Sequence, residues 1–365
     1  MAYNILMMGA SYGSLLASKL LFGGHKIHLV CLPAEADLIN AEGFRVRLPV
    51  RGRKEPVLLE SRKLPGKVTA GGAAGVDPGD YDLVGLCMQD PQYRSPAVRE
   101  LLDSFGKSRV PCMSIMNMPP LPYIKRIPGL DHTGLEAAYT DPRVWDSVDP
   151  KKITLNSPDP QAIRPPDGKA NELLVTLPTN FKCARFEDDK DTQIIRNLEK
   201  DVEAARFDAP EGKIELPVKL KAYDSIWVPL AKRAMLLAGN YRCVTKDGMR
   251  TAQEAVHSDI ETSRSVYNFV SDLCVKLAAA YFSNGTRSPG AGAQQRRPQH
   301  RARRQARAAD RQAEGAEPSG DRRDGGAGRR AAGGQPQEGG LASPVGRVSR
   351  RRNPPTVGMR RITLR

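Results

Sequence analysis

The first thirty-one residues alternate between apolar runs and glycines in an order that few folds accommodate. Residues 4–8 (Asn-Ile-Leu-Met-Met) are almost wholly apolar, which predicts a short buried strand. A glycine-containing turn follows, residues 15–22 have the spacing of a helix, and Gly23 and Gly24 end that helix. Residues 25–31 (His-Lys-Ile-His-Leu-Val-Cys) predict a second strand. This order indicates a βαβ unit and therefore a parallel sheet covered by helices.

The turn between the first strand and the helix reads Gly-Ala-Ser-Tyr-Gly-Ser over residues 9–14. A helix that starts after a glycine turn presents free backbone N–H groups to a pyrophosphate, and glycine lets backbone and phosphate approach closely. The usual spacing for dinucleotide binding is G-x-G-x-x-G. Gly9 fits it, whereas Ser11 holds the second glycine position and Gly13 comes one residue early. We predict nucleotide binding here; the alternative is a tight β–α turn that binds nothing. The candidate cofactor-binding residues of this turn are Gly9, Ser11, Tyr12, Gly13 and Ser14.

Length and composition favour a soluble enzyme in a reducing compartment. The 365 residues suffice for two domains. No 18-residue apolar run and no basic N-terminal region occur, so we expect neither a membrane span nor a signal peptide. Six scattered cysteines without a C-x-x-C pair indicate free thiols and a cytoplasmic location. We expect no metal: His257, Asp259 and Glu261 are close in sequence, but their spacing does not put all three on one helical face.

The composition changes abruptly near residue 285. Residues 285–365 hold 19 Arg, no Lys, six acidic residues and no aromatic residue, so this segment carries 13 of the net 15 positive charges and leaves +2 for residues 1–284. Such a segment buries too little apolar surface to fold, and we expect disorder. Its arginines could bind nucleic acid or an acidic partner. However, Arg, Ala, Gly and Pro without Lys is also what a GC-rich gene encodes out of frame. We favour that origin, or another non-native C-terminus, and consider nucleic-acid binding the weaker interpretation.

The remaining patterns predict an α/β half followed by a helical half. We expect three parts: a Rossmann-like domain over residues 1–210, a partial helical domain over 211–284, and the basic tail over 285–365. The prolines of residues 119–122 should break any helix there. Residues 140–180 are rich in Pro and Asp and are hard to place, apart from a late strand over 172–177. The expected strands are 44–49, 56–60, 81–88, 110–116, 172–177 and 182–186, and the expected helices are 34–42, 95–105, 192–205, 225–237, 249–272 and 273–283.

Several of these segments, in this order, resemble the ketopantoate reductase (2-dehydropantoate 2-reductase) family. Residues 9–17 resemble its opening glycine motif, residues 39–46 (Ile-Asn-Ala-Glu-Gly-Phe-Arg-Val) its helix-to-strand segment, and residues 82–89 its fourth strand. The resemblance implies that Gln89, in the loop after that strand, meets the cofactor. Asn117 sits where the family has a Gln-Asn-Gly motif whose asparagine approaches nicotinamide and substrate, although Met116 and Met118 flank it here.

The most specific match to the family lies in residues 227–240. The family places a catalytic lysine in a helix with asparagines four and eight residues later. Lys232 and Asn240 fit this pattern, but Leu236 takes the middle position. The resemblance implies that Lys232 polarises the substrate carbonyl and that Asn240 binds substrate. The alternatives are a solvated lysine beside Arg233 and an asparagine that merely caps the helix.

The resemblance also implies NADP as cofactor, a 2-oxo acid as substrate and a place in pantothenate biosynthesis; it is compatible with a homodimer. Residues 31–33 (Cys-Leu-Pro), at the tip of the second strand, include no acid for a ribose hydroxyl, which disfavours NAD. Arg51, Arg53 or Lys54 could reach a 2′-phosphate, but a solvated turn is the simpler interpretation. Arg242 and Lys246 could bind a substrate carboxylate, although we favour a surface role.

Two other functions stay open on the sequence. The family's later serine and its lysine-orienting acid would fall after residue 282, where no match occurs, so the chain could bind nucleotide without turnover. The second alternative is a nucleic-acid binder that acts through its basic tail. The absence of aromatic residues in that tail argues against specific single-strand recognition.

Overall fold

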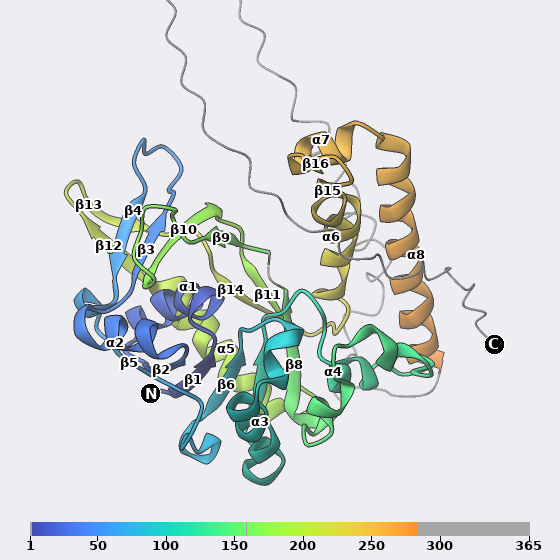
Figure 1. The fold of residues 1–365 in the computed structure, drawn as a ribbon, viewed down its shortest axis with the longest axis horizontal. Helices are drawn as coiled ribbons and strands as arrows, with labels where there is room; N and C mark the ends of the chain where they lie inside the picture. The colour runs from blue at the N-terminus through green and yellow to red at the C-terminus, as the bar shows by residue number, and fades with distance from the viewer. Residues whose placement is uncertain (1, 158, 284–365) are drawn as a thin grey trace, which may run out of the picture. The chain divides into compact units, whose positions relative to one another are not determined.

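An eight-stranded sheet forms the centre of the fold in a computed structural model of the chain (Figure 1). The structure describes residues 2–157 and 159–283. The predicted tail, residues 285–365, lies outside the described residues. Within the described part, the α/β class expected from the sequence is confirmed.

The sheet has the strand order β14-β11-β8-β7-β6-β1-β2-β5. The six strands from β5 to β8 run parallel. Numbered along the chain, these six stand in the order 3-2-1-4-5-6, which is the order of a Rossmann fold. β11 pairs antiparallel with β8, and β14 pairs parallel with β11. The strand bounds are β1 Asn4–Met8, β2 Lys26–Val30, β5 Lys67–Gly71, β6 Leu83–Leu86, β7 Cys112–Ser114, β8 Ile153–Ser157, β11 Phe181–Ala184 and β14 Leu220–Tyr223.

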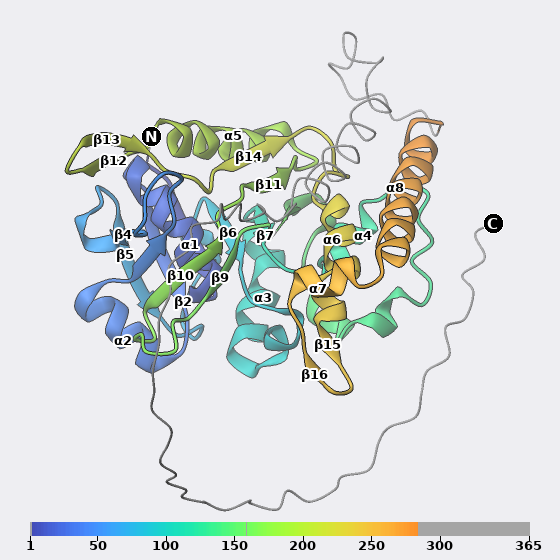
Figure 2. The ribbon, with the colours of Figure 1, turned by 90° about the horizontal axis from the view of Figure 1, so that it is seen from above.

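Alternate side chains of each central strand enter two separate apolar layers. In β1, Ile5 and Met7 join one layer, while Leu6 and Met8 join the other. Helices α1 (Ala10–Leu20) and α5 (Asp189–Ala204) contribute to the first layer, and α3 (Pro96–Ser108) contributes to the second. Both faces of the parallel sheet are therefore covered, which explains why its strands are apolar throughout. Figure 2 shows α5, which belongs to the first apolar layer, lying along β14.

A second sheet of four strands, in the order β4-β3-β10-β9, lies against the first apolar layer. β3 (Arg45–Leu48) pairs antiparallel with β4 (Val57–Glu60), and both strands lie where they were predicted. The two late strands were also predicted, but they separate: β10 (Glu172–Leu177) joins β3 and β9 (Gln161–Ile163), while β11 joins the main sheet. The short connection between β10 and β11 gives no local sign of this separation.

Two predictions about helix starts were wrong. α1 begins at Ala10, five residues earlier than expected, because Gly9 alone makes the turn with a φ of 110°. A short helix, α4 (Leu121–Lys125), forms where the prolines were expected to prevent one. Pro122 lies in its first turn, where a backbone N–H has no helical acceptor and its loss costs nothing.

The helices over residues 225–283 differ from the prediction in their bounds: the first is interrupted by a turn, and the last two residue ranges form a short helix and one long helix. Instead of one helix over 225–237, a 3₁₀ turn (Leu230–Lys232) leads into α6 (Arg233–Ala238). The segments 249–272 and 273–283 become α7 (Ala252–His257) and one long helix, α8 (Ile260–Ser283). α2 (Pro33–Glu42) agrees with prediction. Two small hairpins complete the described elements: β12 (Arg206–Ala209) with β13 (Gly212–Glu215), and β15 (Val244–Thr245) with β16 (Gly248–Met249). The main sheet runs past residue 210 to Tyr223.

Candidate active site

The carboxyl ends of β1, β6, β7 and β8 meet at one edge of the sheet because these strands are parallel. Gly9 follows β1, Gln89 comes soon after β6, and Asn117 comes soon after β7. The chain order of the strands reverses between β1 and β6, and in open α/β sheets this reversal is where ligands bind. The glycine turn predicted from the sequence therefore lies at the reversal point.

Gly9 is fitted tightly to this place. A Cβ atom added to it would lie 3.0 Å from the backbone carbon and oxygen of Cys87, directly after β6. The Gly9 N–H donates to the Val30 carbonyl at 2.8 Å. No side chain caps the N-terminus of α1, and its first turn holds no acid. The N–H groups of this turn are thus left for a ligand, and a pyrophosphate fits them.

The other residues of the turn are either partly exposed or buried against the sheet. Ser11 and Tyr12 are partly exposed in the first turn of α1. Gly13 faces the sheet instead: a Cβ there would meet Leu29 and Met7 at 3.4 Å. Gly13 therefore permits close packing of helix on strand, which is the role of the third glycine in the usual spacing. Ser14 is 5% exposed and lies inside the protein.

Asn117 and Gln89 both lie at the accessible edge. Asn117 is half-buried after the fully buried Met116, and its side chain makes no hydrogen bond to any other residue that the structure describes. Gln89 is also half-buried, and its backbone N–H donates to Gln92 Oε1 at 2.8 Å. The Asn117 amide is consequently available to a ligand.

Lys232 is buried, which rules out a solvated surface lysine: the residue is only 8% exposed. Its Nζ lies 3.4 Å from Asp159 Oδ1 and 3.4 Å from the Asp159 backbone carbonyl oxygen. Burial lowers the pKa of Lys232, and the charge of Asp159 opposes this. Asp159 comes just after β8 and is 6% exposed, so Lys232 reaches the same edge of the sheet as Asn117 and Gly9.

Asp159 also binds a second lysine. Its Oδ2 lies 2.6 Å from Lys182 Nζ on β11, while its Oδ1 has the longer contact to Lys232 and no well-aligned hydrogen bond to a described residue. The family resemblance implies an acid that orients the catalytic lysine, and the segment after residue 282 shows no match to it. Among the described residues, Asp159 is a carboxylate beside Lys232 from a different part of the chain.

Asn240 does not share a continuous helix with Lys232. α6 ends at Ala238 with Gly239 as its C-cap, and a second 3₁₀ turn begins at Asn240. No hydrogen bond joins Asn240 to Lys232 within the described residues, and Leu236 is 2% exposed. Arg242, for which a surface role was favoured, is half-buried: it donates to the Ala238 carbonyl at 3.2 Å and to Ser263 Oγ at 2.9 Å, which ties α6 to α8.

Comparison with solved structures finds proteins of similar fold. A provisionally assigned ketopantoate reductase from Ralstonia solanacearum MolK2 superposes with a TM-score of 0.50 and 13% identity, over 76% of each chain. The 2-dehydropantoate 2-reductase of Methylococcus capsulatus gives 0.47 and 16%, over 84% of this chain and 79% of that one. The chain has the fold of the ketopantoate reductases. No protein-family model and no curated protein sequence matches it.

Three residues around Lys232 were not singled out by the sequence: Asp159 and Lys182, which form ion pairs there, and Arg233, whose charge interacts with Asp159. Asp159 was missed because the strand before it, Ile153–Ser157, stands in the Pro- and Asp-rich segment that was hard to place. The pattern Ile-Thr-Leu-Asn-Ser after two lysines could have revealed that strand. Lys182 and Arg233 had no local signal, because their proximity to Asp159 depends on how the strands and α6 are arranged.

Other features of the described residues lie away from this site. Two surface depressions of about 700 and 560 Å³ are lined by residues of α5 and β14 and by residues around Gly75–Gly79 and α3, respectively. Within the described ranges, no cluster of three or more His, Cys, Asp or Glu residues could hold a metal ion. None of the helices described there has the length and apolar character of a membrane span. The six cysteines are unpaired.

Proposed function

We propose that this protein is an NADP-dependent reductase that transfers a hydride to a 2-oxo acid, with a ketopantoate-like substrate. The observation that carries the proposal is the buried amine of Lys232 beside Asp159, at the carboxyl edge of a sheet with Rossmann strand order. A buried lysine held by one carboxylate at a ligand-binding edge is typical of a catalytic group.

The residues present fit a dinucleotide. Gly9, Ser11 and Tyr12 would hold the pyrophosphate at the uncapped start of α1, and Gln89 and Asn117 would lie toward the nicotinamide. The nicotinamide, when bound, supplies the hydride that adds to the carbonyl carbon of the substrate.

Lys232 would act on the carbonyl oxygen. Its ammonium donates a hydrogen bond to that oxygen, and the developing alkoxide is stabilised by the positive charge in a site that excludes water. Because burial lowers the pKa of Lys232, the ammonium gives up its proton more readily, and the product oxygen ends as a hydroxyl. Asp159 would keep the ammonium in position. The product is the corresponding 2-hydroxy acid, and Asn240 would bind substrate from the 3₁₀ turn that it begins.

The surroundings of the β2 tip support NADP. The exposed tip residue Leu32 offers no acid, and the nearest carboxylate, Glu35, forms an ion pair with Arg164. The ion pair engages both groups, so the tip of β2 offers no free carboxylate for the ribose hydroxyls of NAD. Arg53, one of three basic residues that could reach a 2′-phosphate but for which a solvated turn was favoured, pairs with Glu211.

The test combines turnover with binding. NADPH oxidation is measured across a panel of 2-oxo acids for the wild type, Lys232→Ala and Lys200→Ala, the last replacing an exposed lysine of α5. We expect Lys232→Ala to lower kcat by about 100-fold or more. The control should keep wild-type turnover. In parallel, NADPH should raise the melting temperature of both variants, and more than NADH does, because binding to the folded state stabilises it.

The alternatives give different results. Undiminished turnover in Lys232→Ala would refute the catalytic assignment. Stabilisation by NADPH without oxidation of NADPH on any 2-oxo acid would instead indicate a nucleotide-binding protein without turnover.

A further inference from the structure

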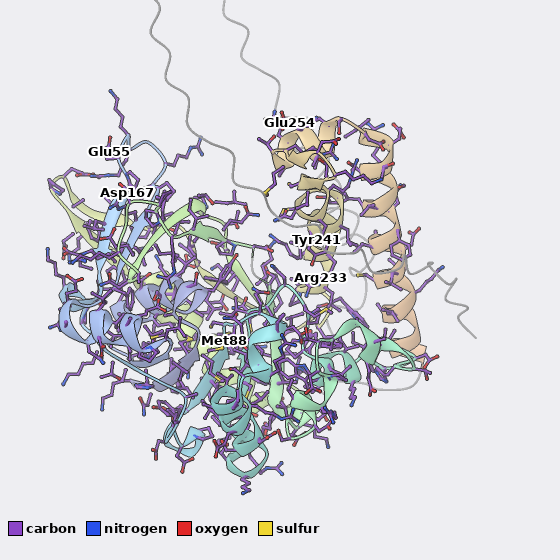
Figure 3. The ribbon with its side chains drawn as sticks, viewed as in Figure 1. Glu55, Met88, Asp167, Arg233, Tyr241 and Glu254 are labelled. Atoms are coloured by element: carbon purple, nitrogen blue, oxygen red, sulfur yellow. The ribbon has the colours of Figure 1, made fainter. Side chains whose placement is uncertain are left out.

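Arg233, the residue after Lys232, has a buried guanidinium without a partner. Its Nη1 and Nη2 atoms are both inaccessible, and neither has a hydrogen-bond partner among the described residues. Buried polar atoms are nearly always hydrogen-bonded, and an unpartnered charged group costs more than a neutral one. Two orphaned nitrogens on one guanidinium therefore indicate that a ligand supplies their acceptors. Figure 3 labels Arg233 and Tyr241 in the α6 region and Met88 after β6 in the α/β part.

The charges around Arg233 identify the kind of ligand. Asp159 is the carboxylate that acts on Arg233, and it is already bound to Lys182 and Lys232. One carboxylate thus faces three cationic side chains. The neighbouring tyrosines Tyr123, Tyr139 and Tyr241 act on the charge of Arg233, but no described tyrosine hydroxyl accepts from Nη1 or Nη2. Burial lowers the pKa of Arg233 to about 10, so the guanidinium stays cationic at neutral pH.

We propose that Arg233 binds the carboxylate of the substrate, so that Arg233 and Lys232 together select 2-oxo acids over neutral carbonyl compounds. This inference rests on the proposed function. A guanidinium offers two parallel N–H donors, which match the two oxygens of a carboxylate. In a 2-oxo acid the carboxylate is bonded directly to the carbonyl carbon. Arg233 and Lys232 both interact with Asp159, and the charge of Arg233 acts on Lys232, so the two cations can hold the two adjacent functional groups of one small substrate.

The test separates recognition of the carboxylate from chemistry at the carbonyl. Arg233→Met and Arg233→Lys are compared with the wild type and with Arg264→Met, which removes an exposed arginine of α8. Steady-state constants are measured with a 2-oxo acid and with its methyl ester. Melting temperatures with NADPH are measured with oxamate, an unreactive analogue that has a carboxylate next to a carbonyl, and with its neutral ethyl ester.

For Arg233→Met, we expect kcat/KM on the acid to fall by about 100-fold, mostly through KM, and kcat/KM on the ester to change little. Arg233→Lys should lie between Arg233→Met and wild type, because it keeps the charge and loses the two parallel donors. Oxamate should stabilise the wild type and Arg264→Met but not Arg233→Met, and ethyl oxamate should stabilise none of them.

Equal losses on acid and ester, or an unchanged response to oxamate in Arg233→Met, would overturn the proposal. So would a wild type that oxamate does not stabilise. If the wild type reduces no 2-oxo acid but still binds oxamate through Arg233, the anion site stands and the proposed reductase function fails.

Discussion

Lys19 is a buried lysine at the opposite end of α1 from the glycine turn, and its titration tests the packing described above. It lies in the last turn of α1, is 1% exposed and donates to the Pro217 carbonyl at 3.1 Å. Burial, followed by the charge of Lys219, lowers the pKa of Lys19 from 10.5 to about 7. We predict that Lys19→Met stabilises the protein at low pH and loses this advantage as the pH rises.

The magnitude follows from the pKa. The fall from 10.5 to about 7 corresponds to about 5 kcal/mol, at about 1.4 kcal/mol for each pKa unit. Between these two values the unfolded chain binds a proton that the folded chain does not hold. The free energy of unfolding therefore rises with pH across this window, and the destabilisation is complete below pH 7. Methionine removes that cost, while an unpaired Pro217 carbonyl costs about 1–3 kcal/mol.

The assay is urea unfolding followed by circular dichroism at pH 6 and pH 9. We expect Lys19→Met to be more stable than wild type by roughly 2–4 kcal/mol at pH 6, and this difference to shrink by about 3 kcal/mol at pH 9. Lys26→Met, which replaces an exposed lysine of β2, should change stability by less than about 0.5 kcal/mol at either pH. A difference between Lys19→Met and wild type that is the same at both pH values would refute the reasoning.

Two further predictions test the glycine turn and a buried histidine. Gly9→Ala should abolish stabilisation by NADPH and lower the free energy of unfolding by more than Gly52→Ala does. Both glycines have positive φ, but only at Gly9 does an added Cβ meet backbone, at 3.0 Å; equal losses measured by urea unfolding would contradict this. His25 is fully buried, accepts from the Tyr3 N–H and contacts Asp201, and burial lowers its pKa. Because the unfolded chain then takes up the proton more readily, wild type should lose more stability between pH 7 and pH 5 than His25→Gln does; parallel pH profiles would count against it.

Much of the Rossmann part was readable from local pattern. The apolar runs at residues 4–8 and 81–88 contain the short strands β1 and β6, which are buried on both faces, and such strands need no alternation of polar and apolar residues. Gly24 ends the first helical segment in the left-handed conformation that favours glycine. These features depend only on neighbouring residues, so the sequence predicts them directly.

The start of α1 and the course of residues 225–237 were predicted less well. Small residues such as Ser11 and Ser14 are compatible with either a turn or a helix, and the packing of Gly13 on Leu29 and Met7 favours the helix. Around Lys232, a 3₁₀ turn replaces the regular helix. Helical spacing therefore could not place Asn240 relative to the lysine.

By itself, the sequence determined the βαβ opening, the glycine turn at Gly9, the lysine at position 232 and the change of composition near residue 285. The tertiary structure alone decided that Asp159, 73 residues away, is the partner of Lys232, and that the guanidinium of Arg233 is buried without one. The physical reason is that secondary structure follows from local periodicity. The meeting of a strand end with a distant helix follows from strand order and packing, which no local pattern encodes.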